Sequence, residues 1–311
     1  MASEKWKRGN VIFPNGNRRI PGLSKKVPHD LSLLTTSTYS AVLELQRMLQ
    51  ADDFLPRMDI YPMLKFNAHL GFQFNELPFL QRIEAAAAAG FRAVEFPSPY
   101  EFDASLLADH LAQYSLPLIQ FAAPAGVTKG IAALQGKEEE FRNGLLRAAS
   151  YAKALACSDV HIMSGVTTQD DAGRVFGSNL EYAVKYFEDQ GLRPLIEVIC
   201  AQEMPGYYMS DFSKAQQVLE TFPSVGLILD LYHAQLLTGD AADVLARFYD
   251  RTVHVQIADC PGRHEPGTGS IDFAALFAAL QQRGYTGWIG CEYRPSGSTV
   301  ASLDWIRQLS A

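Results

Sequence analysis

Short apolar runs alternate with longer amphipathic stretches along most of this chain. Runs bounded by turn-forming residues are typical of buried strands, and such strands are expected at residues 64–68, 93–96, 118–122, 160–163, 195–198, 227–229, 253–257 and 288–291. Apolar residues recur at helical spacing in the stretches 77–89, 141–156, 180–188, 212–221, 241–248, 273–283 and 299–308. Gly90 and Gly284 stand where such helices should end before the next strand. The chain therefore repeats a strand–helix unit.

Repeated strand–helix units predict a parallel sheet, and eight of them predict a sheet that closes into a (β/α)8 TIM barrel. Residues 63–311 match the roughly 250 residues typical of this barrel. A doubly wound sheet is the alternative, but no Gly-x-Gly-x-x-Gly motif follows the first expected strand. We therefore expect an α/β fold in which residues 63–311 form the TIM barrel domain.

The first 62 residues have a different composition. Positions 1–26 hold seven basic residues and one acidic residue, together with Asn, Gly and Pro residues that oppose a continuous helix. A short amphipathic helix is expected from about Ser40, with Val42, Leu45 and Leu49 on one face. We interpret residues 1–62 as a partly ordered N-terminal extension. Its basic residues could contact RNA or a membrane surface, but we expect neither as a partner; contact with a second subunit of a homo-oligomer is left open.

Composition and charge exclude several classes of protein. Hydrophobic residues make up 48% and charged residues 20% of the chain, as in an ordinary soluble protein with a core. The net charge of −7 disfavours nucleic acid as a partner, and no run approaches the roughly 18 apolar residues of a membrane span. Four cysteines without a Cys-x-x-Cys pair, and no secretory signal, predict free thiols in the cytoplasm. A small molecule is the expected substrate.

The last four expected strands each carry a polar residue at the end. These residues are Glu197, Asp230, Gln256 and Glu292, and the carboxyl ends of barrel strands form the active site in this architecture. Three carboxylates on one rim would repel one another without a cation. Four oxygen donors suit Mg²⁺ or Mn²⁺ better than Zn²⁺, which favours His and Cys. We predict a divalent metal at this rim; four unrelated residues that each cap the following helix are the alternative.

Loops beside these strand ends add candidates for substrate binding. His233 follows Asp230 by three residues, and the charged loop after residue 257 carries Arg263 and Glu265 among prolines and glycines. The planar guanidinium of Arg263 is suited to clamp a substrate carboxylate through two parallel hydrogen bonds. Four further residues at or near strand ends are expected to support the site: His69, Glu95, His161 and His254.

These residues stand in motifs that resemble the hydroxypyruvate isomerase family, which includes the 2-oxo-tetronate isomerases, within the xylose-isomerase-like barrels. The similarity extends from about Met63 to Arg307. Its motifs are Ile-Glu197, Asp230-Leu-Tyr-His233, His254-Val-Gln256-Ile-Ala-Asp259, Arg263-His-Glu265-Pro and Gly-Cys-Glu292-Tyr. The resemblance implies that a divalent metal is held by Glu197, Asp230, Gln256 and Glu292. It also implies that Glu197 and Glu292 act as an acid–base pair.

The reaction that the resemblance implies is an aldose–ketose type isomerisation through an enediolate. The implied substrate is a small hydroxylated 2-oxo acid, either hydroxypyruvate or 2-oxo-tetronate. The chain departs from the family around the substrate: Val-Ile-Cys200 follows Glu197 where many members have Pro-Ile-Asn, and Ser270 replaces an acidic residue. A ketose 3-epimerase on the same barrel is the alternative. An apurinic endonuclease and a non-catalytic metal-binding barrel are less favoured, the endonuclease because the chain has seven His and a net charge of −7.

Overall fold

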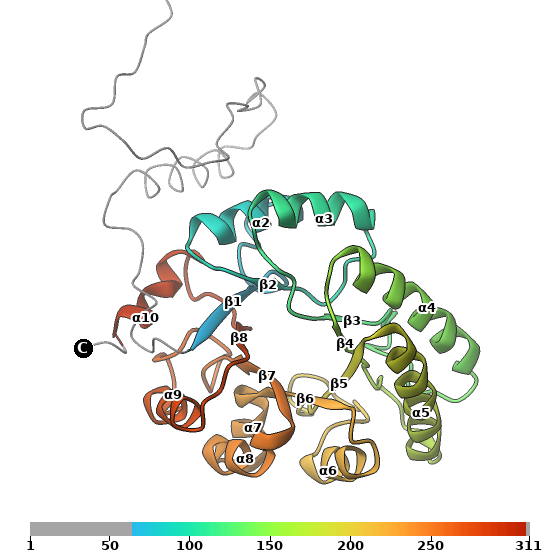
Figure 1. Ribbon diagram of the computed structural model, residues 1–311. Coiled ribbons are helices and arrows are strands. Elements are labelled where there is room, and N and C mark those ends of the chain that lie inside the picture. The colour runs from blue at the N-terminus through green and yellow to red at the C-terminus, as the bar shows by residue number, and fades with distance from the viewer. Residues whose placement is uncertain (1–63, 309–311) are drawn as a thin grey trace, which may run out of the picture. The chain divides into compact units, whose positions relative to one another are not determined.

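A computed structural model describes residues 64–308, which contain a parallel sheet of eight strands. The strands are β1 (Lys65–His69), β2 (Val94–Glu95), β3 (Phe121–Ala122), β4 (Asp159–His161), β5 (Arg193–Glu197), β6 (Gly226–Asp230), β7 (Thr252–Ile257) and β8 (Trp288–Cys291). They surround a common interior, and the helices lie outside them (Figure 1). The predicted (β/α)8 barrel is confirmed.

The outer layer consists of helices that follow the strands along the chain (Figure 1). The helices are α2 (Phe79–Ala88), α3 (Ala104–Gln113), α4 (Glu138–Ala154), α5 (Ala172–Gln190), α6 (Phe212–Thr221), α7 (Leu231–Thr238), α8 (Ala241–Phe248), α9 (Phe273–Gln282) and α10 (Trp305–Gln308). Short 3-10 turns, η1 (Tyr249–Arg251) and η2 (Ala301–Asp304), precede β7 and α10.

The strand order is β2-β1-β8-β7-β6-β5-β4-β3, and each neighbouring pair is parallel. Val94 joins the two ends of this sheet. Its carbonyl accepts a hydrogen bond from the N–H of Ile119 at 2.9 Å, and its own N–H donates to the carbonyl of Pro117 at 3.0 Å. The barrel is thereby nearly closed, and the carboxyl ends of its strands face one rim.

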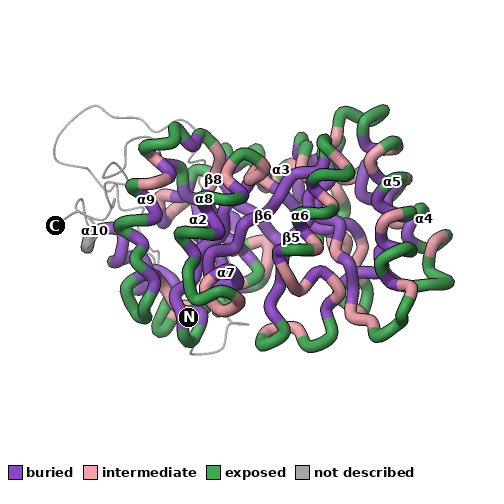
Figure 2. Tube along the Cα trace, turned by 90° about the horizontal axis from the view of Figure 1, so that it is seen from below, coloured by how far each residue is buried: buried purple, intermediate pink, exposed green. Residues whose placement is uncertain are grey.

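Both faces of each central strand are buried, because side chains point alternately into the barrel and under the helices. All five residues of β6 are buried. The helices complete the core: α5 turns Phe176, Leu180, Ala183 and Phe187 inward at helical spacing, and none is more than 1% exposed. Buried residues follow the strands, whereas exposed residues lie on the outer turns of the helices (Figure 2).

The elements differ from the expected ones at a few places. β2 and β3 are shorter than the runs 93–96 and 118–122, and Pro97 and Pro117, which lack an N–H donor, flank these runs. The apolar pattern misses α3 and α7, and it places the start of α5 eight residues late. The first four residues of α7 are all buried, so it shows no amphipathic period.

The remaining expectations either agree with the structure or concern features that it does not describe. The extension 1–62 and the helix expected from Ser40 lie outside the described residues. Between residues 64 and 308, no helix is long and apolar enough to cross a membrane. All four cysteines are buried and unpaired, which agrees with the expected free thiols. A cytoplasmic location and a homo-oligomer stay predictions.

Candidate active site at the carboxyl rim

The carboxyl ends of β5 to β8 bring the four expected metal ligands to one rim of the barrel. Glu197 and Asp230 are the last residues of β5 and β6. Gln256 lies one residue before the end of β7, and Glu292 follows β8 directly. The register pairs Asp230 with Gln256 across β6 and β7. None of the four is more than 9% exposed, so the sequence places these donors together in a buried site.

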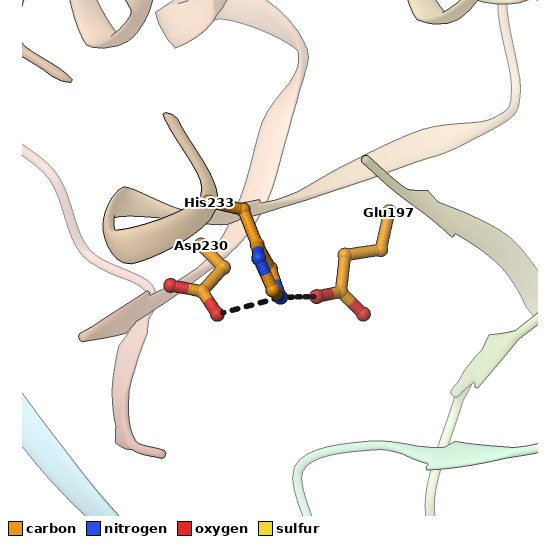
Figure 3. Close-up of side chains that lie close together, drawn as sticks. All are labelled: Glu197, Asp230 and His233. Carbon is orange, nitrogen blue, oxygen red and sulfur yellow. Dashed lines mark ion pairs between the residues drawn. The ribbon is translucent and has the colours of Figure 1, made fainter. Parts of the chain in front are cut away.

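The two carboxylate oxygens of Asp230 have different partners: one caps a helix and the other faces the site. Oδ1 accepts a hydrogen bond from the backbone N–H of Tyr232 at 2.8 Å and caps the first turn of α7. Oδ2 lies 3.4 Å from Nε2 of His233, which is also 3.7 Å from Oε1 of Glu197 (Figure 3). Glu197, Asp230 and His233 can each offer one ligand atom, and these three atoms all lie within 4.8 Å of one another. Helix capping, the alternative reading of a strand-end residue, therefore coexists with the site at Asp230.

Burial and mutual repulsion change the acidity of the two glutamates. Burial raises the pKa of Glu197 well above its ordinary value, and the carboxylates of Glu292 and Asp230 raise it further. Burial likewise raises the pKa of Glu292 well above its ordinary value, although the guanidinium of Arg263 opposes this shift. Buried carboxyl groups that retain protons so firmly lack sufficient positive charge nearby. A cation bound among them would supply it.

The donor set fits such a cation. Oε1 of Gln256 and Oε2 of Glu292 are buried and have no hydrogen-bond partner among the described residues. Polar atoms left in this state destabilise a protein unless something else binds them. Together with the carboxylates of Glu197 and Asp230 they form an all-oxygen set, which hard ions such as Mg²⁺ and Mn²⁺ prefer.

His233 is arranged differently from these oxygen donors. Its Nδ1 lies 3.5 Å from the backbone N of Cys200 and 3.2 Å from the Cys200 thiol sulfur. A backbone N–H can only donate, so Nδ1 accepts and the neutral ring carries its proton on Nε2. Burial lowers the pKa of His233 to about 4, against the opposing charge of Asp230. In this tautomer His233 is a neutral N–H donor directed at the carboxylates, and only the other tautomer would offer Nε2 to a metal.

Arg263 lies buried among the carboxylates. Its Nη2 is 3.1 Å from Oε1 of Glu292 and 3.3 Å from Oδ2 of Asp230, and its Nη1 is 3.2 Å from Oε2 of Glu203. Burial alone would lower the pKa of Arg263, but the charges of Glu292, Asp230 and their neighbours raise it above its ordinary value. The Nε of Arg263 has no hydrogen-bond partner within residues 64–308. It is therefore a charged, buried donor available to a ligand.

Asp259 organises the loop after β7 that carries Arg263, and its backbone carbonyl accepts a hydrogen bond from the Arg263 N–H at 3.0 Å. Asp259 accepts backbone hydrogen bonds at 2.8 to 3.1 Å from Cys260, Gly267, Gly269 and Ile271. A Cβ at Gly269 would clash with this carboxylate, so the close approach requires glycine. Arg263 itself has a φ of 57°, which an L-residue adopts only where its surroundings fix it.

The four residues expected to support the site are all buried near it. Nε2 of His69 is 3.8 Å from Oε1 of Glu292, and Nδ1 of His161 is 3.6 Å from Oε2 of Glu197. Burial lowers the pKa of His69 to about 4 and that of His161 to about 3, so both rings are neutral at neutral pH. Glu95 and His254 pair with each other, with 2.5 Å between Oε2 and Nε2.

Glu265 contacts the loop after β8. It accepts a hydrogen bond from the backbone N–H of Ser296 at 3.0 Å, and its role in substrate binding stays a prediction. Glu203, by contrast, was not expected in the site. Its Oε2 accepts from Arg263 at 3.2 Å and from Arg294 at 3.0 Å, while its Oε1 accepts from the Tyr232 hydroxyl at 2.9 Å. Glu203 lies in a loop, six residues beyond the end of β5, where no motif marks it.

Comparison with known proteins identifies the family. The family model for the xylose isomerase-like TIM barrel matches residues 83–309, and the chain belongs to this family. Its curated relatives include the 2-oxo-tetronate isomerase of Haemophilus influenzae, 38% identical over 256 residues that cover 79% of this chain and 99% of the relative. The hydroxypyruvate isomerase of Escherichia coli is 36% identical over 254 residues, 78% and 98% of the two chains. The resemblance found in the motifs is confirmed, and the chain is an enzyme of the isomerase class.

Solved structures agree with this fold. A crystal structure from Brucella melitensis named AP endonuclease, family 2 is 39% identical, with a TM-score of 0.75, and covers 79% of this chain and 99% of that one. The D-allulose 3-epimerase from Methylomonas sp. is 22% identical with a TM-score of 0.63, covering 79% of this chain and 90% of that one. This second likeness shows the fold alone.

Proposed function

We propose that this chain isomerises a small hydroxylated 2-oxo acid, hydroxypyruvate or 2-oxo-tetronate, with Mg²⁺ or Mn²⁺ held by Glu197, Asp230, Gln256 and Glu292. The supporting observation is the buried rim, where oxygen donors, two glutamates with raised pKa and a guanidinium share one site. The names of the relatives support the substrate class. A bound ion would supply positive charge that polarises the substrate carbonyl and stabilises the negative charge of the enediolate.

Glu197 and Glu292 move the proton in this proposal. Isomerisation takes a proton from the carbon that carries the hydroxyl group and returns one to the neighbouring carbonyl carbon, while the hydroxyl proton passes to the former carbonyl oxygen. The two glutamates come from the ends of β5 and β8, which β6 and β7 separate in the sheet, so they approach a substrate from different sides. Their raised pKa belongs to the metal-free site; with an ion bound, each glutamate can exchange a proton only if it keeps one carboxylate oxygen free of the metal. One acts as base and the other as acid, and their roles exchange in the reverse reaction.

His233 and Arg263 hold the substrate oxygens. The Nε2–H of His233 and the Nε–H of Arg263 are buried donors whose positions are fixed by Cys200 and by the loop after β7. Donors that are in place before the substrate arrives stabilise charge as it develops on the substrate. The positive charge of Arg263 also favours an acid, because an unpaired carboxylate is expensive to bury.

The test is an assay of the purified chain with hydroxypyruvate, with 2-oxo-tetronate and with a neutral ketohexose. Each reaction is run with a chelator and again with added Mg²⁺ or Mn²⁺. We expect the acids to be converted only when metal is present and the ketohexose to be converted poorly. Conversion of a ketohexose to its 3-epimer, with no conversion of either acid, would assign the epimerase activity instead.

The Brucella structure named AP endonuclease raises a second reaction class. Within residues 64–308, one group of at least three His, Cys, Asp or Glu side chains is placed to hold a metal, and it includes one histidine. That composition and the chain's net charge of −7 favour a single hard ion and an uncharged or small anionic substrate over DNA. Incision of a duplex with an abasic site, absent in Glu197→Gln, would establish the endonuclease activity.

A further inference from the structure

Gln256 suits a hard metal ion only if its side-chain amide is turned the right way. The amide presents an oxygen acceptor on one arm and an NH₂ donor on the other, and a half-turn exchanges them. With the NH₂ group facing the rim, the side chain would repel a cation. Nε2 of Gln256 donates a hydrogen bond to Oε1 of Glu95 at 3.1 Å, whereas Oε1 of Gln256 is buried without a partner among the described residues. The observed orientation is therefore the one that presents oxygen.

Glu95 is placed to impose this orientation. It is the last residue of β2 and reaches Gln256 on β7 past the two strands between them, β1 and β8. Its side chain is fully buried, with Oε2 2.5 Å from Nε2 of His254 and 3.4 Å from the donating Nε2 of Gln120. A carboxylate in this position accepts hydrogen bonds and donates none, so it selects the NH₂ arm of the amide.

Gly290 leaves the space in which the two side chains meet. It is the partner of Gln256 in the register of β7 and β8. A Cβ added there would clash with Oε1 of Glu95 and come within 3.0 Å of Nε2 of His254. Glycine in the middle of a strand commonly marks such a close approach. The backbone of β8 thus admits the carboxylate that orients Gln256.

We infer that Glu95 is a positioning residue, which fixes the amide of Gln256 with Oε1 toward the metal. This inference rests on the proposed function, because it requires the metal at the carboxyl rim. Glu95 itself is not among the expected ligands, and it acts through Gln256. By excluding the NH₂ arm, it keeps the ligand set entirely oxygen, which favours hard ions.

The experiment measures Mn²⁺ affinity by electron paramagnetic resonance of the unbound ion. Glu95→Gln keeps the shape of the side chain, but it can offer either arm of an amide to Gln256, so affinity should fall roughly 10- to 100-fold, as for other groups that orient ligands. The double variant Glu95→Gln/Gln256→Glu reverses the pair: a carboxylate now faces the rim whichever way it turns. Its affinity should return to within about threefold of the native value, the coupling expected of residues in contact.

Tyr285→Phe is the matched control for loosening of the same two strands. The single O–H of Tyr285 lies between two acceptors away from the metal rim, the carbonyls of Trp288 on β8 at 2.9 Å and of Val253 on β7 at 3.3 Å. Its loss should lower the melting temperature and leave Mn²⁺ affinity unchanged. Native affinity in a folded Glu95→Gln variant would overturn the inference, and so would a double variant as weak as the single one.

A measurement on the native chain covers the case in which Glu95→Gln does not fold. In the metal-free protein, the side-chain NH₂ resonance of Gln256, assigned by its loss in Gln256→Glu, should exchange slowly with water because Nε2 is hydrogen-bonded and buried. Fast exchange would overturn the inference. Native Mn²⁺ binding without acid isomerisation would remove the proposed function but leave the role of Glu95, and no native Mn²⁺ binding would remove both.

Discussion

Replacing Arg263 by Met should weaken the turnover of a 2-oxo acid and leave the metal site intact. Arg263 is 5% exposed, and its Nε is a buried donor without a partner in the part of the chain that the structure describes. A charge-assisted hydrogen bond from such a donor contributes about 1.5–3 kcal/mol, and about 1.4 kcal/mol corresponds to a tenfold change. We therefore expect kcat/KM for hydroxypyruvate to fall roughly ten- to a hundredfold, mainly through a higher KM.

Arg294 offers a matched control for this substitution. Its Nη2 contacts the same Glu203 at 3.0 Å, and its guanidinium lies 5.8 Å from the ring of Phe72, compared with 4.8 Å for Arg263. The Arg294 side chain is 52% exposed, however, and an exposed ion pair contributes about 1 kcal/mol or less. Arg294→Met should change kcat/KM by less than about fivefold. Arg263→Lys keeps the charge but loses the planar fork of the guanidinium. Its kcat/KM should therefore lie between those of Arg263→Met and Arg294→Met.

The assay is steady-state kinetics with hydroxypyruvate and with a neutral ketohexose, and Mn²⁺ is titrated into each variant. Removing a cation 3.1 Å from Glu292 and 3.3 Å from Asp230 should leave Mn²⁺ affinity unchanged or stronger, because a competing positive charge is gone. A higher KM then reports on the substrate, whereas a lower kcat can also come from Glu292, because the guanidinium lowers the pKa of that group. Acid kcat/KM within about threefold of native in Arg263→Met would refute this placement of the carboxylate. A larger loss in Arg294→Met would place the carboxylate at Arg294.

Four further outcomes are expected. Chelation should abolish isomerisation and added Mg²⁺ or Mn²⁺ should restore it, because the expected ligands are oxygens; full activity in a sample shown to be metal-free by mass spectrometry contradicts this. Glu197→Gln or Glu292→Gln removes a proton acceptor but keeps a ligating oxygen, so kcat should fall by roughly 10² or more; native kcat would leave that glutamate as a ligand only. Metal-free protein should lose stability as the pH rises through the folded-state pKa of Glu197 and Glu292, because that pKa is raised and the folded chain binds more protons than the unfolded chain below it. His69, His161 and His233, whose pKa is lowered by burial, act in the opposite direction and lose this effect above the ordinary histidine pKa, so thermal melts over a pH series should show a fall in Tm with rising pH that Mg²⁺ removes, and no difference between the melts with and without Mg²⁺ would be the wrong result. Deleting residues 1–62 should leave a folded barrel that binds Mn²⁺, because β1 begins at Lys65; an insoluble product would give the extension a structural or subunit role.

The barrel could be predicted because burial on both faces makes each central strand a continuous apolar run. In β6 the run Gly-Leu-Ile-Leu is complete before Asp230 ends it. The closure of the sheet could not be predicted in the same way. It depends on the hydrogen bonds of Val94 with Pro117 and Ile119, and the proline beside each short strand limits pairing in a manner that apolar pattern alone does not record.

The carboxylate rim could be predicted for a related reason. A carboxylate at the end of an apolar strand is a charged group in a buried position, which is costly unless something binds it. This pattern can be recognised from a few neighbouring residues, as at Glu197 and Asp230. Ion pairs between residues far apart in the sequence cannot be recognised from the neighbouring residues in this way. Arg263 is 33 residues from Asp230 and 60 residues from Glu203, and only the fold brings them together.

The sequence also leaves open which atom of a side chain faces the proposed metal site. Gln256 is the same residue whether oxygen or nitrogen points to the rim, and the choice depends on Glu95, 161 residues away. His233 lies within 4.8 Å of two expected ligands, yet the backbone N–H of Cys200 occupies Nδ1 and makes Nε2 a donor. In both cases the deciding partner binds the atom of the side chain that would not face the proposed metal. A ligand set inferred from motifs therefore needs the hydrogen bond on that second atom before histidine and glutamine can be told apart as metal ligands.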